Sequence, residues 1–188
     1  MRRLLTAPLL VLLLATAPAA GANTAPGAIT QALIEPRLAG EGELRWFGLR
    51  VYTAQLWVGG APGLQLERLP TTPFALDLRY GTALKGAAIA SRSLQEIERL
   101  GYGDATRRSR WSEAMQRVFP DVSRGDRLTG VHEPGRGVRF FHNDRPLGLI
   151  EDPEFARAFF AIWLDERTVA PALREALLRA SAEADARR

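Results

Sequence analysis

The chain has 188 residues and no cysteine, which excludes disulfide bonds and thiolate metal sites. Its 25 basic and 21 acidic residues give a net charge of +4, and Lys85 is the one lysine among the basic residues. Because acidic residues are interleaved with the arginines, the sequence forms no basic patch, and no nucleic-acid partner is expected.

The first 22 residues have the organisation of a secretory signal peptide. Arg2 and Arg3 precede an apolar run at 9–15, and small residues then lead to a cleavage site after Ala22. The apolar run is too short for a permanent membrane anchor, and no later segment is apolar enough to cross a membrane. We therefore expect a periplasmic protein, exported with a signal peptide at 1–22, whose residues 23–188 form a single domain.

Alternating side chains predict strands in the first half of the mature chain. A short apolar stretch at 32–34 is a candidate first strand, and the segment 44–58 is predicted to be a hairpin around Gly48. The second strand of that hairpin has one apolar face, but Thr53 and Gln55 interrupt the other face. The segment 74–80 then alternates apolar and polar residues, as a half-exposed strand does.

Helical spacing follows this strand. Apolar residues recur at three- and four-residue steps from 84 to 100, and Gly101 ends this predicted helix. Asp104 is a candidate N-cap for a second helix, which Pro120 stops. Two helices are therefore expected in a row between the strand at 74–80 and the next strands.

The second half repeats the pattern of strands followed by helices. Short strands are predicted at 126–132, 137–143 and 146–150. The sequence Asp152–Pro153–Glu154 is typical of a helix start, and a last helix is expected from about Thr168. This order predicts an α+β fold in which helices cover one antiparallel sheet.

Four stretches together resemble one family. They are LRWFGLRVYTAQLWV at 44–58, WSEAMQRVFPDVSRGDRL at 111–128, GVRFFHNDRPLGLI at 137–150 and DPEFARAFFAIWL at 152–164. In this order they are similar to the bacterial, exported branch of the chalcone isomerase-like proteins. The resemblance covers roughly residues 32–178 and implies an open-faced β-sandwich with a ligand cleft between the antiparallel sheet and a layer of helices.

The resemblance carries over few of the functional side chains of the plant isomerases. Thr53 stands where those enzymes have a threonine that helps to order a water and the substrate oxygen. Arg45 or Arg50 would replace an arginine that guides an acidic group. Ile89 stands at the position of a tyrosine, Arg92 replaces a lysine and Glu96 an asparagine, so no catalytic residue is assigned.

The expected function is non-catalytic binding of a small amphipathic or acyl ligand, such as a fatty acid. The candidate ligand-binding residues are Arg45, Arg50, Thr53, Gln55, Tyr80 and Ile89. Two alternatives stay open: an intramolecular lyase or isomerase acting on a chalcone-like or enone substrate, and an envelope scaffold or partner-binding protein with a closed cleft.

Each candidate also has a purely structural interpretation. Thr53 and Gln55 could be core groups bonded to the backbone, Arg45 a solvated edge residue, and Tyr80 a packing residue with a wet tip. No metal or other cofactor is expected. The turn at 134–135 pairs His132 with about residue 138, which leaves His142 far along the strand.

Overall fold

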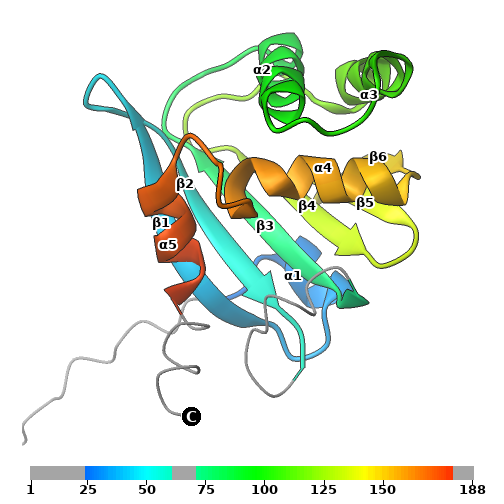
Figure 1. Cartoon of the computed structure of the whole chain (residues 1–188). Helices are drawn as coiled ribbons and strands as arrows, with labels where there is room; N and C mark the ends of the chain where they lie inside the picture. Colours follow the sequence, from blue (N-terminus) through cyan, green and yellow to red (C-terminus); the bar gives the residue numbers. More distant parts are fainter. Residues whose placement is uncertain (1–23, 61–70, 180–188) are drawn as a thin grey trace, which may run out of the picture.

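The computed structural model describes residues 24–60 and 71–179, which form one antiparallel sheet with helices on both faces (Figure 1). The predicted signal peptide lies outside the described residues. Six strands pair in chain order, each antiparallel to the next: β1 (Arg37–Trp46), β2 (Leu49–Val58), β3 (Phe74–Tyr80), β4 (Arg127–Glu133), β5 (Gly137–His142) and β6 (Arg145–Ile150). The predicted α+β fold is confirmed.

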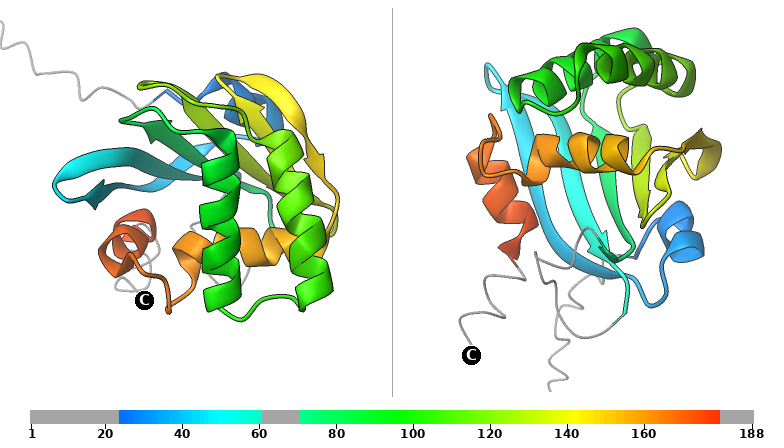
Figure 2. Two further views of the ribbon diagram at one scale, coloured as in Figure 1. Left: turned by 90° about the horizontal axis from the view of Figure 1, so that it is seen from above. Right: turned by 45° about the vertical axis from the view of Figure 1, so that its right-hand side comes forward.

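The helices lie very unequally on the two faces of the sheet. α2 (Gly86–Arg99) and α3 (Ala105–Val118) connect β3 to β4, and α4 (Pro153–Leu164) and α5 (Pro171–Leu177) follow β6. These four helices lie on one face, whereas the short α1 (Gly27–Ala32) lies on the other (Figure 2). No described helix has both the length and the apolarity needed to span a membrane.

The main core lies between the sheet and the four helices. Ala54, Leu56, Leu76 and Leu78 point from the central strands toward the helices, as the predicted alternation requires. Opposite them, α4 contributes a row of buried aromatic rings: Phe155, Phe159, Phe160 and Trp163. Full burial of a side chain of this size stabilises the fold by about 1.5–3 kcal/mol.

α1 covers a second, smaller apolar cluster on the opposite face of the sheet. Ala28, Ile29 and Leu33 are buried there against Trp57 and other residues of the central strands. The strand predicted at 32–34 is therefore wrong, because the chain forms a helix up to Ala32 and starts its first strand at Arg37. Tertiary packing against Trp57 decides the conformation of this short apolar stretch, which has no clear period of its own.

α5 lies directly on β1 because that strand carries glycines at the contact. A Cβ atom added at Gly40 would overlap with the backbone carbonyls of Ala176 and Leu177, and one at Gly42 would meet the Leu173 side chain. The last helix begins at Pro171, three residues later than predicted from Thr168. Thr168 instead bonds the end of α4, donating its hydroxyl to the Ile162 carbonyl over 2.7 Å.

Candidate functional site

The predicted site residues lie in three different places. Thr53 and Gln55 point away from the four-helix layer, whereas Tyr80 is buried beneath it and Ile89 packs into the same core from α2. Arg45 is at the exposed end of the β1–β2 hairpin. Four of the six, Arg50, Thr53, Gln55 and Tyr80, line one pocket, which lies on the face of the sheet away from the four helices, whereas Arg45 and Ile89 do not line it. A ligand-binding role for these residues stays a prediction. A residue's face of the sheet follows from strand register, and neighbouring residues such as Tyr52 and Thr53 point to opposite faces.

A pocket of about 580 Å³ lies on the face of the sheet opposite the four helices. We call it the open-face pocket. Its walls come from β1, β2, β3, the turn before β4, and the chain that leads into α1. The lining is mostly polar and charged: Thr24, Pro26, Glu41, Glu43, Arg50, Thr53, Gln55, Asp77, Arg79, Tyr80, Arg124, Gly125 and Arg127.

The strand register aligns this lining in two cross-strand rows. In one row, Thr53 lies opposite Arg79, and Arg79 lies opposite Arg127. In the next row, Gln55 lies opposite Asp77, and Asp77 opposite Thr129. Arg79 and Arg127 are thus cross-strand neighbours on β3 and β4, and the Asp77 carboxyl in the next row is close enough to interact with the charges of both.

Two of the four arginines of the pocket are already engaged. Arg127 donates from Nη2 to both carboxylate oxygens of Asp144 over 2.7 Å, and Arg50 pairs with Glu43 at 3.2 Å. Arg79 and Arg124 are exposed and make no ion pair within the described part of the chain. The open-face pocket therefore presents two guanidinium groups that are available to an anion.

Asp77 forms the buried floor of the open-face pocket. Its side chain is 4% exposed, and Oδ1 accepts a hydrogen bond from the Thr129 hydroxyl. Burial raises the pKa of the Asp77 carboxyl, while the Thr129 hydrogen bond and the nearby Arg127 charge act in the opposite direction.

Thr53 and Gln55, the polar residues that interrupt the apolar pattern of β2, lie beside polar side chains of the neighbouring strands. Gln55 donates from Nε2 to Glu41 on β1 and accepts from the Trp57 indole N–H over 3.1 Å. Gln55 thereby connects the polar end of this face to the apolar cluster under α1. Thr53 is half-buried between Glu43 and Arg79 in the register.

The end of the β1–β2 hairpin carries a small charged cluster. Arg45 and Arg50 both bond Glu43, and Arg45 also donates to the Gly48 carbonyl over 3.1 Å. The hydrogen bonds from Arg50 and Arg45 hold the pKa of Glu43 below its ordinary value. Arg50 lines the open-face pocket, and Arg45 does not.

On the helix side, described side chains pack closely where the cleft was expected. The Trp163 indole N–H donates to the Tyr52 hydroxyl over 3.0 Å, and the Tyr52 ring contacts Tyr80 edge-on. Burial raises the pKa of Tyr52 to about 12 and also raises that of Tyr80, so both phenols are neutral at physiological pH. Ile89 packs against the same core.

Glu96 adds a buried charge near this cluster. Its side chain is 6% exposed and pairs with Arg92 at 2.5 Å and with Arg99 at 2.8 Å. Arg92 and Glu96 are the residues that the resemblance aligns with a lysine and an asparagine of the plant isomerases. In this protein they form an ion pair with each other. Tyr52 and Glu96 on the helix side are therefore bonded to partners within the protein, whereas the Tyr80 ring contacts Tyr52 and its hydroxyl has no hydrogen bond within the described residues.

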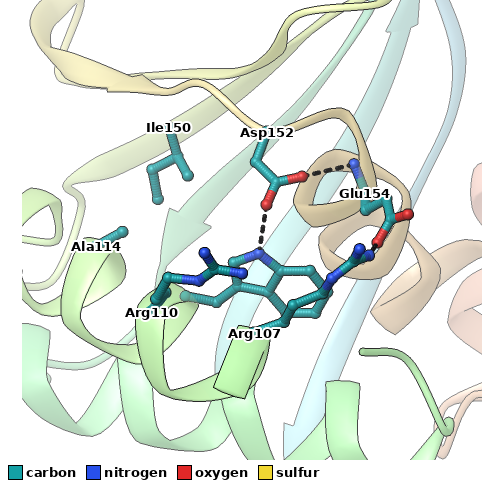
Figure 3. A pocket seen from close by; sticks show the side chains of 7 residues that line it. Arg107, Arg110, Ala114, Ile150, Asp152 and Glu154 are labelled. Atoms are coloured by element: carbon teal, nitrogen blue, oxygen red, sulfur yellow. Dashed lines mark hydrogen bonds and ion pairs between the residues drawn. The ribbon is translucent and has the colours of Figure 1, made fainter. Parts of the chain in front are cut away.

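A second concave surface, of about 450 Å³, lies where α3 meets the start of α4 (Figure 3). Asp152 caps α4 by accepting from the backbone N–H groups of Glu154 and Phe155, which confirms the predicted helix start. Its other oxygen accepts from the Trp111 indole over 2.8 Å, and Arg107 pairs with Glu154. Because these polar groups bind one another, the surface serves to join α3 to α4.

The histidines lie apart, as the turn geometry predicted. His132 is opposite Val138 in the β4–β5 register and is stacked on Phe74, with Nδ1 3.0 Å from the Thr72 carbonyl. His142 is 3.4 Å from Asp126. No group of three or more His, Asp or Glu side chains in the described residues is arranged to hold a metal ion.

Sequence reasoning missed Asp77, Arg79, Arg124 and Arg127 as parts of the pocket. The signal for two of them was present, because Asp77 and Arg79 form the polar face of the strand predicted at 74–80. Pairing that face with Thr53 and Gln55 would have brought the four side chains together. Arg124 lies in a turn whose position no periodicity predicts.

The geometry defines an open-faced α+β sandwich with a charged pocket on its less covered face. The family model of chalcone isomerase-like proteins matches residues 37–179, so the chain belongs to the chalcone isomerase-like family. A solved structure, a fatty-acid binding protein of Arabidopsis thaliana, is similar with a TM-score of 0.58 and 14% sequence identity, over 81% of this chain and 92% of that one. At this identity the likeness shows the fold alone. None of the curated proteins compared with the chain matches it.

Proposed function

We propose that this chalcone isomerase-like protein is a non-catalytic binding protein for a small ligand with an acidic head, such as a fatty acid. The observation that carries the proposal is that Arg79 and Arg124 line the open-face pocket, are exposed, and make no ion pair within the described part of the chain. An arginine fork matches the geometry of a carboxylate, and these two guanidinium groups have no carboxylate partner of their own in the described residues. The similar plant protein is named for fatty-acid binding, which supports the same ligand class.

The lining of the pocket suits the head of such a ligand better than its tail. A volume of about 580 Å³ is in the usual range for small-molecule sites, but those sites are mostly apolar. We therefore propose that the acidic head binds Arg79 and Arg124, with Thr53 as a further hydrogen-bond donor. The apolar part then extends along β2 past Val51 toward the hairpin end.

The packing of the helix side supports binding over catalysis. The Tyr52 hydroxyl at its centre accepts a hydrogen bond from the Trp163 indole N–H. The charge of Glu96 is balanced by two arginines. An isomerase would need a group there that is free to contact substrate. Tyr52 and Glu96 are engaged, and the Tyr80 hydroxyl, which is not, belongs to a side chain that is 3% exposed, so the isomerase alternative has weaker support.

Titration calorimetry with a soluble short-chain carboxylate such as octanoate tests the proposal, using the chain from Asn23, which retains every described helix and strand. The double variant Arg79→Gln/Arg124→Gln should weaken binding about tenfold or more, because hydrogen bonds to charged groups contribute about 1.5–3 kcal/mol each. Thr53→Val should weaken it severalfold. The matched control is Arg110→Gln, an exposed arginine in the α3–α4 surface.

Affinities within twofold of one another for all these proteins would contradict the proposal. Absence of any binding by the unmodified chain would also contradict it and would favour the scaffold alternative. Turnover of a chalcone or enone that survives Arg79→Gln/Arg124→Gln but vanishes with Tyr52→Phe would favour the isomerase alternative.

A further inference from the structure

The β1–β2 hairpin ends in three large apolar side chains that contact little of the protein. Trp46 is 67% exposed, Phe47 91% and Leu49 75%. The hairpin end projects beyond the helices in Figure 1 and in the left view of Figure 2. We call Trp46, Phe47 and Leu49 the hairpin tip.

The backbone of the hairpin tip is strained to keep a phenylalanine at its apex. Phe47 has φ +46° and Gly48 φ +79°, the left-handed region that a tight two-residue hairpin turn requires. Gly48 suits this conformation, but an aromatic residue there costs about 1–2 kcal/mol. The β5–β6 turn of the same chain uses Asn143 and Asp144 at φ +48° and +67°, residues that tolerate the region well.

No packing of Phe47 inside the fold offsets this backbone strain. Its recorded ring contact is with Trp46, edge-on at 5.2 Å, and both rings are exposed to solvent. A strained residue that stabilises nothing within its own domain indicates a role outside it. We therefore infer that Trp46, Phe47 and Leu49 contact an apolar surface outside this domain.

Positive charge surrounds the hairpin tip. The side chains of Arg45 and Arg50 are 58% and 46% exposed and share a single carboxylate, that of Glu43, so this cluster keeps a net charge of +1. Arg50 continues into the open-face pocket, where Arg79 and Arg124 add charge without an ion-pair partner in the described residues. An apolar apex with basic residues at its base is the pattern of a segment that enters the headgroup region of an anionic bilayer.

The size of the hairpin tip favours a bilayer over a protein partner. Large aromatic side chains bury about 150–250 Å² each, so the three side chains together supply roughly 400–500 Å². A stable protein interface needs about 800 Å² from each partner and a complementary shape. A lipid surface needs neither, because a few apolar side chains and neighbouring positive charges already favour adsorption.

We propose that the hairpin tip inserts into the interface of an anionic lipid bilayer, with Arg45 and Arg50 next to lipid phosphates. This surface is separate from the ligand-binding role proposed above and does not depend on it. Insertion would bring the mouth of the open-face pocket, through Arg50, to the membrane surface.

Trp46 makes the proposal directly measurable. The other three tryptophans, Trp57, Trp111 and Trp163, are at most 7% exposed. Vesicles of phosphatidylcholine with phosphatidylglycerol, prepared with brominated acyl chains, should therefore quench Trp46 selectively when the chain from Asn23 binds. Binding should weaken on pure phosphatidylcholine and at high salt, since the screening length falls to about 3 Å at 1 M.

Phe47→Asn separates binding from folding. Asn suits a positive φ, so this variant should be as stable as the unmodified chain or more stable, yet bind anionic vesicles about tenfold more weakly. Arg45→Gln/Arg50→Gln should remove most of the salt dependence. The matched control is Ile34→Asn, because Ile34 is 84% exposed but lies in the turn between α1 and β1.

Three results would overturn the proposal. The first is no quenching on anionic vesicles, and the second is equal vesicle binding by Phe47→Asn and the unmodified chain. The third is a dimer in sedimentation velocity that Phe47→Asn abolishes, because it would make a second copy the occupant of the hairpin tip. Octanoate binding that is unchanged in Phe47→Asn would show that the ligand site and the hairpin tip act separately.

Discussion

The indole N–H of Trp163 donates to the hydroxyl of Tyr52 over 3.0 Å and so joins α4 to the second strand of the sheet. The two residues are far apart in the sequence, and both lie in the core between sheet and helices. This contact occupies the region where the family resemblance placed a ligand cleft. The stronger this hydrogen bond is, the more firmly it holds α4 against β2 and keeps the helix side closed.

Removal of both partners of this contact should destabilise the protein by less than the sum of the two single removals. Tyr52→Phe leaves the indole N–H without an acceptor and should lower the free energy of unfolding by about 1–3 kcal/mol. The double variant Tyr52→Phe/Trp163→Phe should lose less than the sum of the two single variants, and urea unfolding measures all four proteins. Strictly additive losses would show that the hydrogen bond contributes nothing of its own.

Glu96→Gln should destabilise the fold by about 1–2 kcal/mol, because it removes a buried charge that two arginines bind. The loss is smaller than for a fully buried pair, since the Arg92 and Arg99 side chains are 61% and 39% exposed and can turn to water. Glu98→Gln is the matched control on the same helix. Glu98 is 63% exposed, and its pair with Arg108 should contribute less than about 1 kcal/mol. Equal losses in the free energy of unfolding for both variants would show that the burial of Glu96 adds nothing to its ion pairs.

Gly40→Ala should displace α5 from the sheet. The added methyl group overlaps with the backbone carbonyls of Ala176 and Leu177, which cannot rotate away as a side chain could. We expect a loss of about 2–3 kcal/mol and faster hydrogen exchange in α5. Gly130→Ala, in β4, is the control because its nearest neighbours are side-chain atoms at 3.4–3.5 Å, so its stability should change little.

Asp77→Asn should change how stability depends on pH. Burial raises the pKa of Asp77, so its carboxyl favours the folded state below its ordinary pKa, and that contribution is lost as pH rises through the raised value. The Asn variant lacks this loss, so its stability relative to the unmodified chain should improve from acid toward neutral pH. Urea unfolding at several pH values measures the difference.

Asp121→Asn is the control with the opposite sign. Lys85 and the Gly86 amide lower the pKa of Asp121, so this carboxylate contributes stability above its ordinary pKa that is lost as pH falls. The stability of Asp121→Asn relative to the unmodified chain should therefore decline toward neutral pH. Parallel pH profiles for the two variants would contradict the different environments of Asp77 and Asp121.

Local patterns in the sequence predict the order of elements from the β1–β2 hairpin onward and much of the local structure, but they miss α1. Asp152 followed by Pro153 predicted the start of α4, and the turn at 134–135 predicted the pairing of His132 with Val138. The alternation in β2 separated Ala54 and Leu56 from Thr53 and Gln55 correctly. These features depend on neighbours within a few residues, so periodicity and turn chemistry are sufficient to predict them.

Long-range contacts, which local patterns do not encode, decide which face of the sheet receives the helices and where the pocket lies. Alternation defines two faces of a strand but does not say which one a distant helix covers, and a shift of one residue exchanges them. Thr53 therefore lies beside Arg79 and Arg127 on the face away from the helices, while its neighbour Tyr52 meets Trp163. Both arrangements depend on contacts between segments that are far apart in the chain.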